Sequence, residues 1–307
     1  KKIYSGENWN STRRSPLTEQ GVEVKEGDYL IAIDGNQVTT DNNLYSYLEN
    51  KAGKPVEVTV NIKPSQDNSR TYLVKPLSSE LELLYLDWVK ERRAMVDSLS
   101  GGRIGYIHVP NTEIAGNREL FHGMYTYFNK EALIIDDRYN GGGFIPDRMA
   151  DLLDRQTLAW WSRSGLEPSK SPAIAHDGPK VMLINGFSSS GGDAFPYFFK
   201  KMELGKLIGT RTWGGLVGIS GNAEFVDGGF IDVPQFGVFD RDEGWIIEGI
   251  GVYPDMEVVD RPEELASGND PCIEKAVEVL LRQLEENPVK KVTVPSPPDR
   301  SKWHEEL

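Results

Sequence analysis

The sequence predicts an α/β protein in which a small, strand-rich domain precedes a larger domain with a parallel β-sheet. Residues 1–77 carry short apolar stretches separated by turn residues, a pattern that is typical of small β domains. From Ile104 onward, short apolar strands alternate with helical patterns, which favours a parallel sheet covered by helices. The predicted boundaries are therefore a first domain at 1–77, a linker helix at 78–100, a core domain at 101–286 and an extended tail at 287–307.

The first domain is expected to contain at least two strands and a short helix. Tyr29–Ile33 is apolar and is followed by Asp34-Gly35, a dipeptide suited to a tight hairpin turn. From Val56 to Ile62 apolar and polar residues alternate, which is the period of a half-buried strand. Between these strands, Asp41 is a candidate N-cap for a helix near 44–48.

The larger domain is expected to follow a linker helix, because apolar residues repeat at helical spacing over about 79–98. Its clearest strands and helices alternate along the chain: strands at 104–109, 132–136, 180–184 and 206–209, and helices near 116–129, 144–155 and 192–202. Asp270 followed by Pro271 marks the start of a closing helix. The proline-rich stretch 294–298 predicts an extended arm.

Composition argues against several classes of partner. The 307 residues include 47 acidic and 34 basic ones, for a formal net charge of −13, and this excess disfavours nucleic acid or an anionic membrane as a partner. Apolar runs are far shorter than the roughly 18 residues that a membrane-spanning helix needs. The single cysteine, Cys272, excludes internal disulfides and thiolate zinc clusters.

Two glycine-rich segments directly follow predicted strands, at the edge where open α/β sheets bind ligands. Residues 136–143 read Asp-Asp-Arg-Tyr-Asn-Gly-Gly-Gly, and residues 185–193 read Asn-Gly-Phe-Ser-Ser-Ser-Gly-Gly-Asp. Glycines let backbone N–H groups approach a substrate, and a serine at a helix start lies beside unpaired N–H groups. The combination suits acyl transfer, in which a serine attacks a carbonyl and N–H donors stabilise the oxyanion. A serine-rich helix cap beside a flexible turn is the alternative interpretation.

Other motifs in the sequence carry less information. The G-x-S-x-G segment of α/β-hydrolases is absent, because Ser190 stands where its second glycine would be. H-E-x-x-H is absent as well, and we expect no metal and no cofactor. The pair Trp160-Trp161 is compatible with a substrate pocket, an interface or the core.

The first domain resembles a known family of peptide-binding domains. Ser15-Pro16-Leu17, Gly21-Val22 and the segment 27–35, in this order, are similar to the PDZ domains found inside processing proteases. The resemblance implies that an extended peptide end would pair with an exposed sheet edge.

Residues 101 to about 285 resemble the carboxy-terminal half of the tricorn-type proteases, relatives of the carboxy-terminal processing proteases. The segments that carry this resemblance are 103–108, 139–143, 190–193, 207–215 and 248–255. The resemblance implies a crotonase-like core, serine peptidase activity on oligopeptides and a homohexamer. We expect a cytoplasmic location, with a periplasmic or secreted one left open.

The family's catalytic residues fall on specific positions of this sequence. Its nucleophile falls on Ser190, with Ser188 and Ser189 as alternatives. Its catalytic glutamate falls on Glu248, where the side chain would orient and polarise the base.

The oxyanion donors implied by the resemblance are two backbone N–H groups. One is that of Gly191, next after the nucleophile. The other is that of Gly142, with Gly141 as a competitor.

The general base is the point at which this chain departs from part of the family. Processing proteases with a serine–lysine pair carry the lysine in a Thr-x-Gly-Lys segment, and here Thr212–Gly215 ends in glycine, which excludes the lysine mechanism. The tricorn-type alternative is a histidine before the PDZ domain, which would lie upstream of Lys1. Because a serine without a base is a poor nucleophile, these residues alone are expected to be inactive or nearly so.

Four histidines are present in the sequence: His108, His122, His176 and His304. His176, in a predicted loop, is the best substitute for the missing base. Two other functions stay open. One is a non-catalytic module that binds peptides and oligomerises, and the other is the binding of an acyl-CoA thioester by the two N–H donors.

Overall fold

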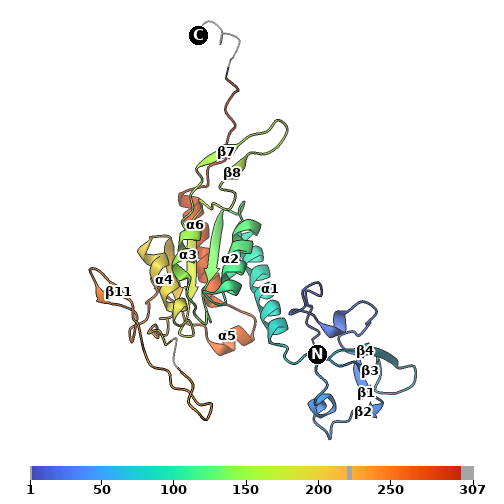
Figure 1. The fold of residues 1–307 in the computed structure, drawn as a ribbon. Helices are drawn as coiled ribbons and strands as arrows, with labels where there is room; N and C mark the ends of the chain where they lie inside the picture. The colour runs from blue at the N-terminus through green and yellow to red at the C-terminus, as the bar shows by residue number, and fades with distance from the viewer. Residues whose placement is uncertain (1, 220–222, 299–307) are drawn as a thin grey trace, which may run out of the picture. The chain divides into compact units, whose positions relative to one another are not determined.

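The computed structural model describes residues 2–219 and 223–298, which form two compact units. The first unit ends at Glu91 and the second begins at Arg92, so the division falls inside the helix α1, Leu81–Ser100. This helix lies within the range 78–100 predicted for the linker helix and begins three residues later. Figure 1 shows the elements of both units, coloured along the chain.

The first unit is built on a four-stranded antiparallel sheet with the order β2-β1-β3-β4. Its strands are β1 Tyr29–Ile33, β2 Asn36–Gln37, β3 Val56–Asn61 and β4 Arg70–Val74. Asp34 and Gly35 join β1 to β2 with φ angles of 48° and 75°, as the predicted tight turn requires. The core of the unit is formed by apolar side chains that include Ile33, Val56, Val58, Val60 and Val74.

The predicted helix of this unit is a short 3₁₀ helix instead. The unit contains two such helices, η1 Pro16–Thr18 and η2 Leu44–Leu48. The expected cap, Asp41, is wrong, because the capping side chain is that of Asn43, which accepts the N–H of Tyr45 at 3.0 Å. Asn43 directly precedes the helix, so its short side chain reaches the N–H two residues further on.

The second unit contains a five-stranded sheet with the order β13-β10-β9-β6-β5, in which all neighbours are parallel. The strands are β5 Ile104–His108, β6 Ala132–Asp136, β9 Lys180–Ile184, β10 Gly205–Gly209 and β13 Met256–Glu257. Every residue of β5, β6 and β9 is buried, as expected of parallel strands covered on both faces. The α/β class predicted for this part of the chain is therefore confirmed.

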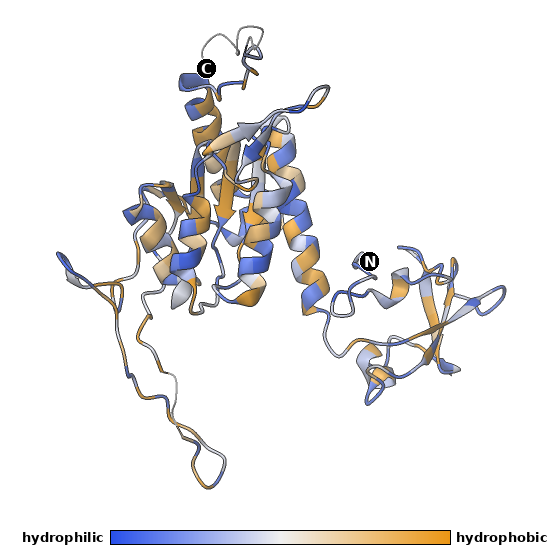
Figure 2. Ribbon diagram, turned by 45° about the horizontal axis from the view of Figure 1, so that its top comes forward, coloured by the Kyte–Doolittle hydropathy of each residue, from blue (hydrophilic) through white to orange (hydrophobic). Residues whose placement is uncertain are grey.

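Helices cover both faces of this sheet. The helices that follow α1 in the chain are α2 Ile114–Thr126, α3 Pro146–Leu153, α4 Gly191–Lys201, α5 Pro262–Ala266 and α6 Pro271–Glu286. Leu133 and Met182 share one apolar cluster with side chains of α2, α3 and α4, whereas α6 contacts β6, β9 and β10. The predicted start of α6 is confirmed, since the Asp270 side chain accepts the N–H of Ile273 at 3.1 Å. Figure 2 shows that the strands between these helices are apolar.

Two short hairpins lie outside the sheet. They are β7 Ala159–Trp161 with β8 Ser169–Ser171, and β11 Phe239–Asp240 with β12 Gly244–Trp245. Between β10 and β11, residues 210–219 and 223–238 extend away from the sheet and are called the arm below (Figures 1 and 2). Residues 287–298 have no regular secondary structure, and the rest of the predicted tail lies outside the described residues.

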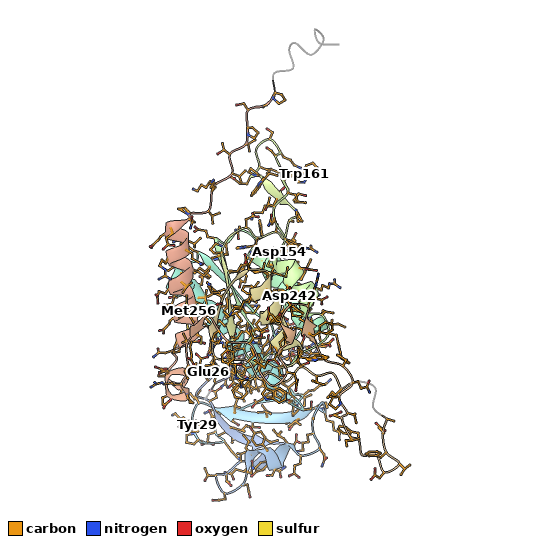
Figure 3. All side chains as sticks on the ribbon, turned by 90° about the vertical axis from the view of Figure 1, so that its left-hand side faces the viewer. Glu26, Tyr29, Asp154, Trp161, Asp242 and Met256 are labelled. Carbon is orange, nitrogen blue, oxygen red and sulfur yellow. The ribbon has the colours of Figure 1, made fainter. Side chains whose placement is uncertain are left out.

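Trp160 and Trp161 do not belong to the core. Both lie on β7 and are exposed, and Figure 3 places Trp161 on the hairpin beyond Asp154, which follows α3. The hairpin adjoins the loop that enters β9, because Thr157, just before it, bonds Asp177. It therefore lies at the amino edge of the sheet, and a core role for the tryptophans is wrong.

Among the helices of residues 2–219 and 223–298, none is both long and apolar enough to cross a bilayer. Within the same residues, no group of three or more histidine, cysteine, aspartate or glutamate side chains is placed to hold a metal ion.

Candidate active site

Ser190 lies at the junction between β9 and α4, on the carboxyl edge of the sheet. Its backbone has φ 56° and ψ −117°, a combination that costs a residue with a side chain free energy and is often found at functional sites. Ser190 occupies the N-cap position of α4, yet its side chain makes no capping hydrogen bond. The side chain is exposed, so the interpretation of this serine as a helix cap does not hold.

The two neighbouring serines are placed differently. Ser188 is fully buried, and its hydroxyl donates to the carbonyl oxygen of Asp137 at 2.7 Å. Ser189 is partly buried, and its N–H donates to the carbonyl oxygen of Asn140 at 3.0 Å. Of the three serines, Ser190 presents the most accessible hydroxyl.

The two glycine-rich segments meet at Ser190. A Cβ atom added to Gly142 would lie 2.8 Å from the Cβ of Ser190 and 3.2 Å from the nitrogen of Gly191. The φ angle of Gly142 is +89°, which is unfavourable for any other residue. Gly142 therefore lets the first segment approach the serine without steric conflict.

The N–H groups of the first segment are already engaged. That of Gly142 donates to Oδ1 of Asn140 at 2.9 Å, and that of Gly141 donates to the carbonyl oxygen of Pro110 at 3.1 Å. For Gly142 to act as the predicted oxyanion donor, its bond to Asn140 would have to open or be shared. By contrast, the hydrogen bonds described for residues 2–219 and 223–298 include none donated by the N–H of Gly191.

Asn140 is a site residue that the sequence prediction missed. Its side chain accepts the N–H of Gly142 and donates to Oδ1 of Asp137 at 2.8 Å, and its backbone carbonyl oxygen accepts the N–H of Ser189. Asp137 is fully buried, and burial raises the pKa of its carboxyl group well above the usual range. Asn140 thus ties the two glycine-rich segments together. The sequence signal that could have identified Asn140 as a site residue is its position between a buried strand and three glycines.

A buried ion cluster anchors the start of the first segment. Arg138 pairs with Asp136 at 2.7 Å, with Asp270 at 3.0 Å and with Asp260 at 2.8 Å. Arg138, Asp136 and Asp270 are almost completely buried. Burial alone would raise the pKa of Asp136, but the adjacent Arg138 guanidinium holds it below its usual value. The cluster fixes the end of β6 to the N-terminus of α6.

Glu248 lies beside the chain segment that contacts Ser190. The N–H of Ser190 donates to the carbonyl oxygen of Gly215 at 2.9 Å. Oε2 of Glu248 accepts the N–H groups of the next two residues, Leu216 at 2.7 Å and Val217 at 2.9 Å. The structure thus brings Ser190, Gly191, Gly142 and Glu248 to one edge of the sheet.

Two of the histidines, His108 and His176, are not placed to serve Ser190. Nε2 of His108 donates to the carbonyl oxygen of Arg138 at 2.9 Å, and Nε2 of His176 donates to that of Lys130 at 3.0 Å. Burial lowers the pKa of both rings, that of His176 to about 4. His176 precedes β9 whereas Ser190 follows it, so the two lie at opposite edges of the sheet, and the idea that His176 replaces the base is wrong.

Two histidines remain. His122 is exposed on α2. His304 lies outside the described residues.

Comparison with known proteins follows the division into two units. Residues 1–79 match the tricorn protease PDZ domain, and residues 103–258 match peptidase family S41. Tricorn protease homolog 1 of Streptomyces coelicolor is 37% identical over 97% of this chain and 28% of its own length. A putative tricorn-like protease C-terminal subunit of Sulfurisphaera tokodaii is 37% identical over 93% of this chain and 33% of its own.

A solved structure supports the same assignment. The crystal structure of the tricorn protease matches with a TM-score of 0.86 and 33% identity, over 92% of this chain and 28% of that one. The chain thus spans about a third or less of the curated relatives it matches. It belongs to peptidase family S41 and corresponds to the C-terminal part of the tricorn proteases, with a PDZ domain before the peptidase domain.

Proposed function

We propose that this chain carries the nucleophile of a serine peptidase that cleaves oligopeptides, and that Ser190 is that nucleophile. The observation that supports this most is the exposed Ser190 hydroxyl, held in a strained turn between a buried strand and a helix and packed against Gly142. The same helix start presents the N–H of Gly191 for an oxyanion. Membership of family S41 agrees with this chemistry.

The reaction would proceed through an acyl-enzyme. Oγ of Ser190 attacks the carbonyl carbon of the scissile peptide bond while its proton passes to a base, and the carbonyl oxygen takes the negative charge beside the N–H of Gly191. The C–N bond then breaks, and the amine leaves with the proton from the base. Water attacks the ester, which releases the acid and restores the serine.

Glu248 would orient the base. Its Oε2 is held by Leu216 and Val217, and Oε1 accepts no hydrogen bond among those described for residues 2–219 and 223–298. The second oxygen is therefore available to a protonated base group, and a fixed carboxylate stabilises the charge that the base acquires.

We propose that the base is a histidine that is not among residues 1–307. The chain by itself would then turn over peptides slowly or not at all. The positions of His108 and His176, both buried and bonded to carbonyl oxygens, support this proposal. A serine hydroxyl depends on such a partner to lose its proton.

Turnover of fluorogenic oligopeptides by the intact protein tests the proposal. Ser190→Ala is expected to lower kcat by about 10³-fold or more, because the oxyanion donors and substrate binding alone leave only a residual rate. Ser188→Ala is the matched control and should keep most of the activity. Retention of wild-type turnover by Ser190→Ala would remove Ser190 as the nucleophile.

A peptide-binding module without catalysis is the second candidate. The first unit contains a cavity of about 820 Å³ whose lining includes Leu17, Leu30, Val58 and Val60, a size within the usual range for ligand sites. This reading predicts saturable binding of oligopeptides with no turnover in the intact protein, so any turnover that depends on Ser190 excludes it as the sole function.

Assembly into a homo-oligomer, with a hexamer as the expected state, is also part of the proposal. The arm between β10 and β11 exposes large apolar side chains that a contact with a second copy would cover, among them Phe225, Phe230, Ile231, Val233 and Phe236.

A further inference from the structure

Asp193 is a buried carboxylate in the first turn of α4, three residues after Ser190. It is completely inaccessible to solvent, and its own N–H donates to the carbonyl oxygen of Ser190 at 2.9 Å. Burying a carboxylate costs free energy unless its oxygens are well paired. The proposed chemistry does not use this side chain.

The partners of Asp193 all lie in the segment that follows β10. Oδ1 accepts the N–H of Gly214 at 2.7 Å, and Oδ2 accepts the N–H of Gly215 at 3.3 Å. The Thr212 side chain also favours the ionised form of this carboxylate, and its hydroxyl accepts the N–H of Val252 at 2.8 Å. Burial raises the pKa of Asp193 overall, and these hydrogen bonds oppose the rise by favouring the ionised form.

These contacts close a ring with the nucleophile. The N–H of Gly215 donates to Asp193, the carbonyl oxygen of Gly215 accepts the N–H of Ser190 at 2.9 Å, and Ser190 bonds Asp193 through the backbone. The strained backbone of Ser190 is therefore held on both sides. Such a conformation persists only where the surroundings fix it.

The same segment also holds Glu248. Four successive backbone N–H groups, from Gly214 to Val217, donate to two carboxylates, the first two to Asp193 and the next two to Glu248. The segment is thus fixed to Ser190 through Asp193 at one end and to Glu248 at the other. Displacement of the segment would change the distance between Ser190 and Glu248.

We propose that Asp193 is a positioning residue that sets the spacing between Ser190 and Glu248 by holding the backbone of Gly214 and Gly215, and with it the segment up to Val217 that Glu248 binds. This inference rests on the proposed peptidase function for its kinetic consequence. Its structural part, the clamp on the segment, stands on the hydrogen bonds alone.

The variant Asp193→Asn in the intact protein tests both parts. The amide keeps the shape of the side chain but offers one oxygen acceptor in place of two and adds an N–H₂ group that faces a backbone donor. We expect kcat to fall by about 10- to 100-fold with KM changed by less than about threefold, because a small misplacement of catalytic groups acts on the chemical step. Asp147→Asn is the matched control, since Asp147 is an exposed aspartate in the first turn of α3.

Hydrogen exchange gives a readout that does not depend on activity. In Asp193→Asn the amides of residues 214–217 should exchange faster than in the wild type, while those of β6 and β9 keep their rates and Asp147→Asn leaves all of them unchanged. Unchanged exchange at 214–217, or wild-type kcat in Asp193→Asn, would overturn the proposal. A wild-type protein that neither turns over peptides nor reacts with a serine-directed probe would refute the proposed function, and the exchange data would still test the clamp.

A milder pair of variants covers the case in which Asp193→Asn does not fold. Thr212→Val removes a hydroxyl that favours the ionised Asp193 carboxylate and accepts the N–H of Val252, whereas Thr212→Ser keeps it. We expect a drop in kcat of about three- to tenfold, with KM unchanged, in the valine variant alone. Equal kcat in the two variants would contradict the proposal.

Discussion

Single residues at the site were predictable where a backbone conformation demands a particular residue type. The glycine run and the serine run each follow a predicted strand, and the structure places Gly142 against Ser190. What the sequence could not show is the direction of each N–H group. The N–H of Gly142 is turned toward Asn140, and this depends on φ angles that a run of three glycines leaves open.

Gly142→Ala tests the close approach of the two segments. The added Cβ would lie 2.8 Å from that of Ser190, at a φ of +89°, so the glycine-rich segment or the serine must move. We expect peptide turnover to fall by about 100-fold or more. Gly141→Ala is the matched control, because its Cβ would meet no atom within 4 Å. Equal losses of kcat in the two variants would contradict this account.

Secondary structure elements were predictable where they are long and buried. The strands β5, β6 and β9 and the helices α1 and α6 lie within about three residues of their predicted bounds, because apolar periodicity is strong there. β7, β8, β11, β12 and β13 have two or three residues each. Such short strands form because they pair with segments that are distant in the sequence, and a local residue pattern cannot predict that pairing.

The ion cluster that joins β6 to α6 yields a prediction on stability. Arg138→Met leaves Asp136 buried without its cation and Asp270 with Arg92 alone, at 3.5 Å, and we expect it to lower the free energy of unfolding by about 3–5 kcal/mol. Arg103→Met is the control, because its pair with Glu131 is partly exposed and should contribute about 1 kcal/mol or less. Chemical denaturation of the variants measures both effects, and similar losses would refute the distinction.

The loop that enters β9 yields a prediction on pH dependence. The pKa of His176 is lowered from 6.5 to about 4 by burial, so as the pH falls below about 6.5 the unfolded ring binds a proton that the folded ring does not. The free energy of unfolding should therefore decrease between about pH 6.5 and pH 4, with about 3 kcal/mol from this residue. His176→Gln should show a shallower pH dependence in chemical denaturation. His122→Gln, on the exposed side of α2, should keep the wild-type dependence, and equal slopes in all three proteins would contradict the assignment.

At the scale of the whole molecule, the order of the two domains was predictable from the sequence. Segments that resemble PDZ domains come first in the chain, and segments that resemble the tricorn-type proteases follow them. The PDZ match ends before α1 and the peptidase match begins after it. Assembly was not predictable from physical patterns, since the apolar residues of the arm form neither a helix nor a strand period.

The exposed arm yields a prediction on assembly. Phe230→Asp places a charge on a side chain that is 71% exposed, so it should not destabilise the fold, but it should weaken a contact with a second copy. We expect a smaller mass by light scattering of the intact protein. Ile62→Asp, equally exposed in the first unit, is the control. An unchanged mass for Phe230→Asp would exclude this side chain from the contact.

The most direct measurement is the mapping of a fluorophosphonate adduct on the intact protein by peptide mass spectrometry. Such a probe reacts only with a serine whose hydroxyl is activated and accessible. We expect one adduct, on Ser190, that is absent in Ser190→Ala and forms more slowly in Glu248→Gln. An adduct on another serine, or labelling that persists in Ser190→Ala, would contradict it.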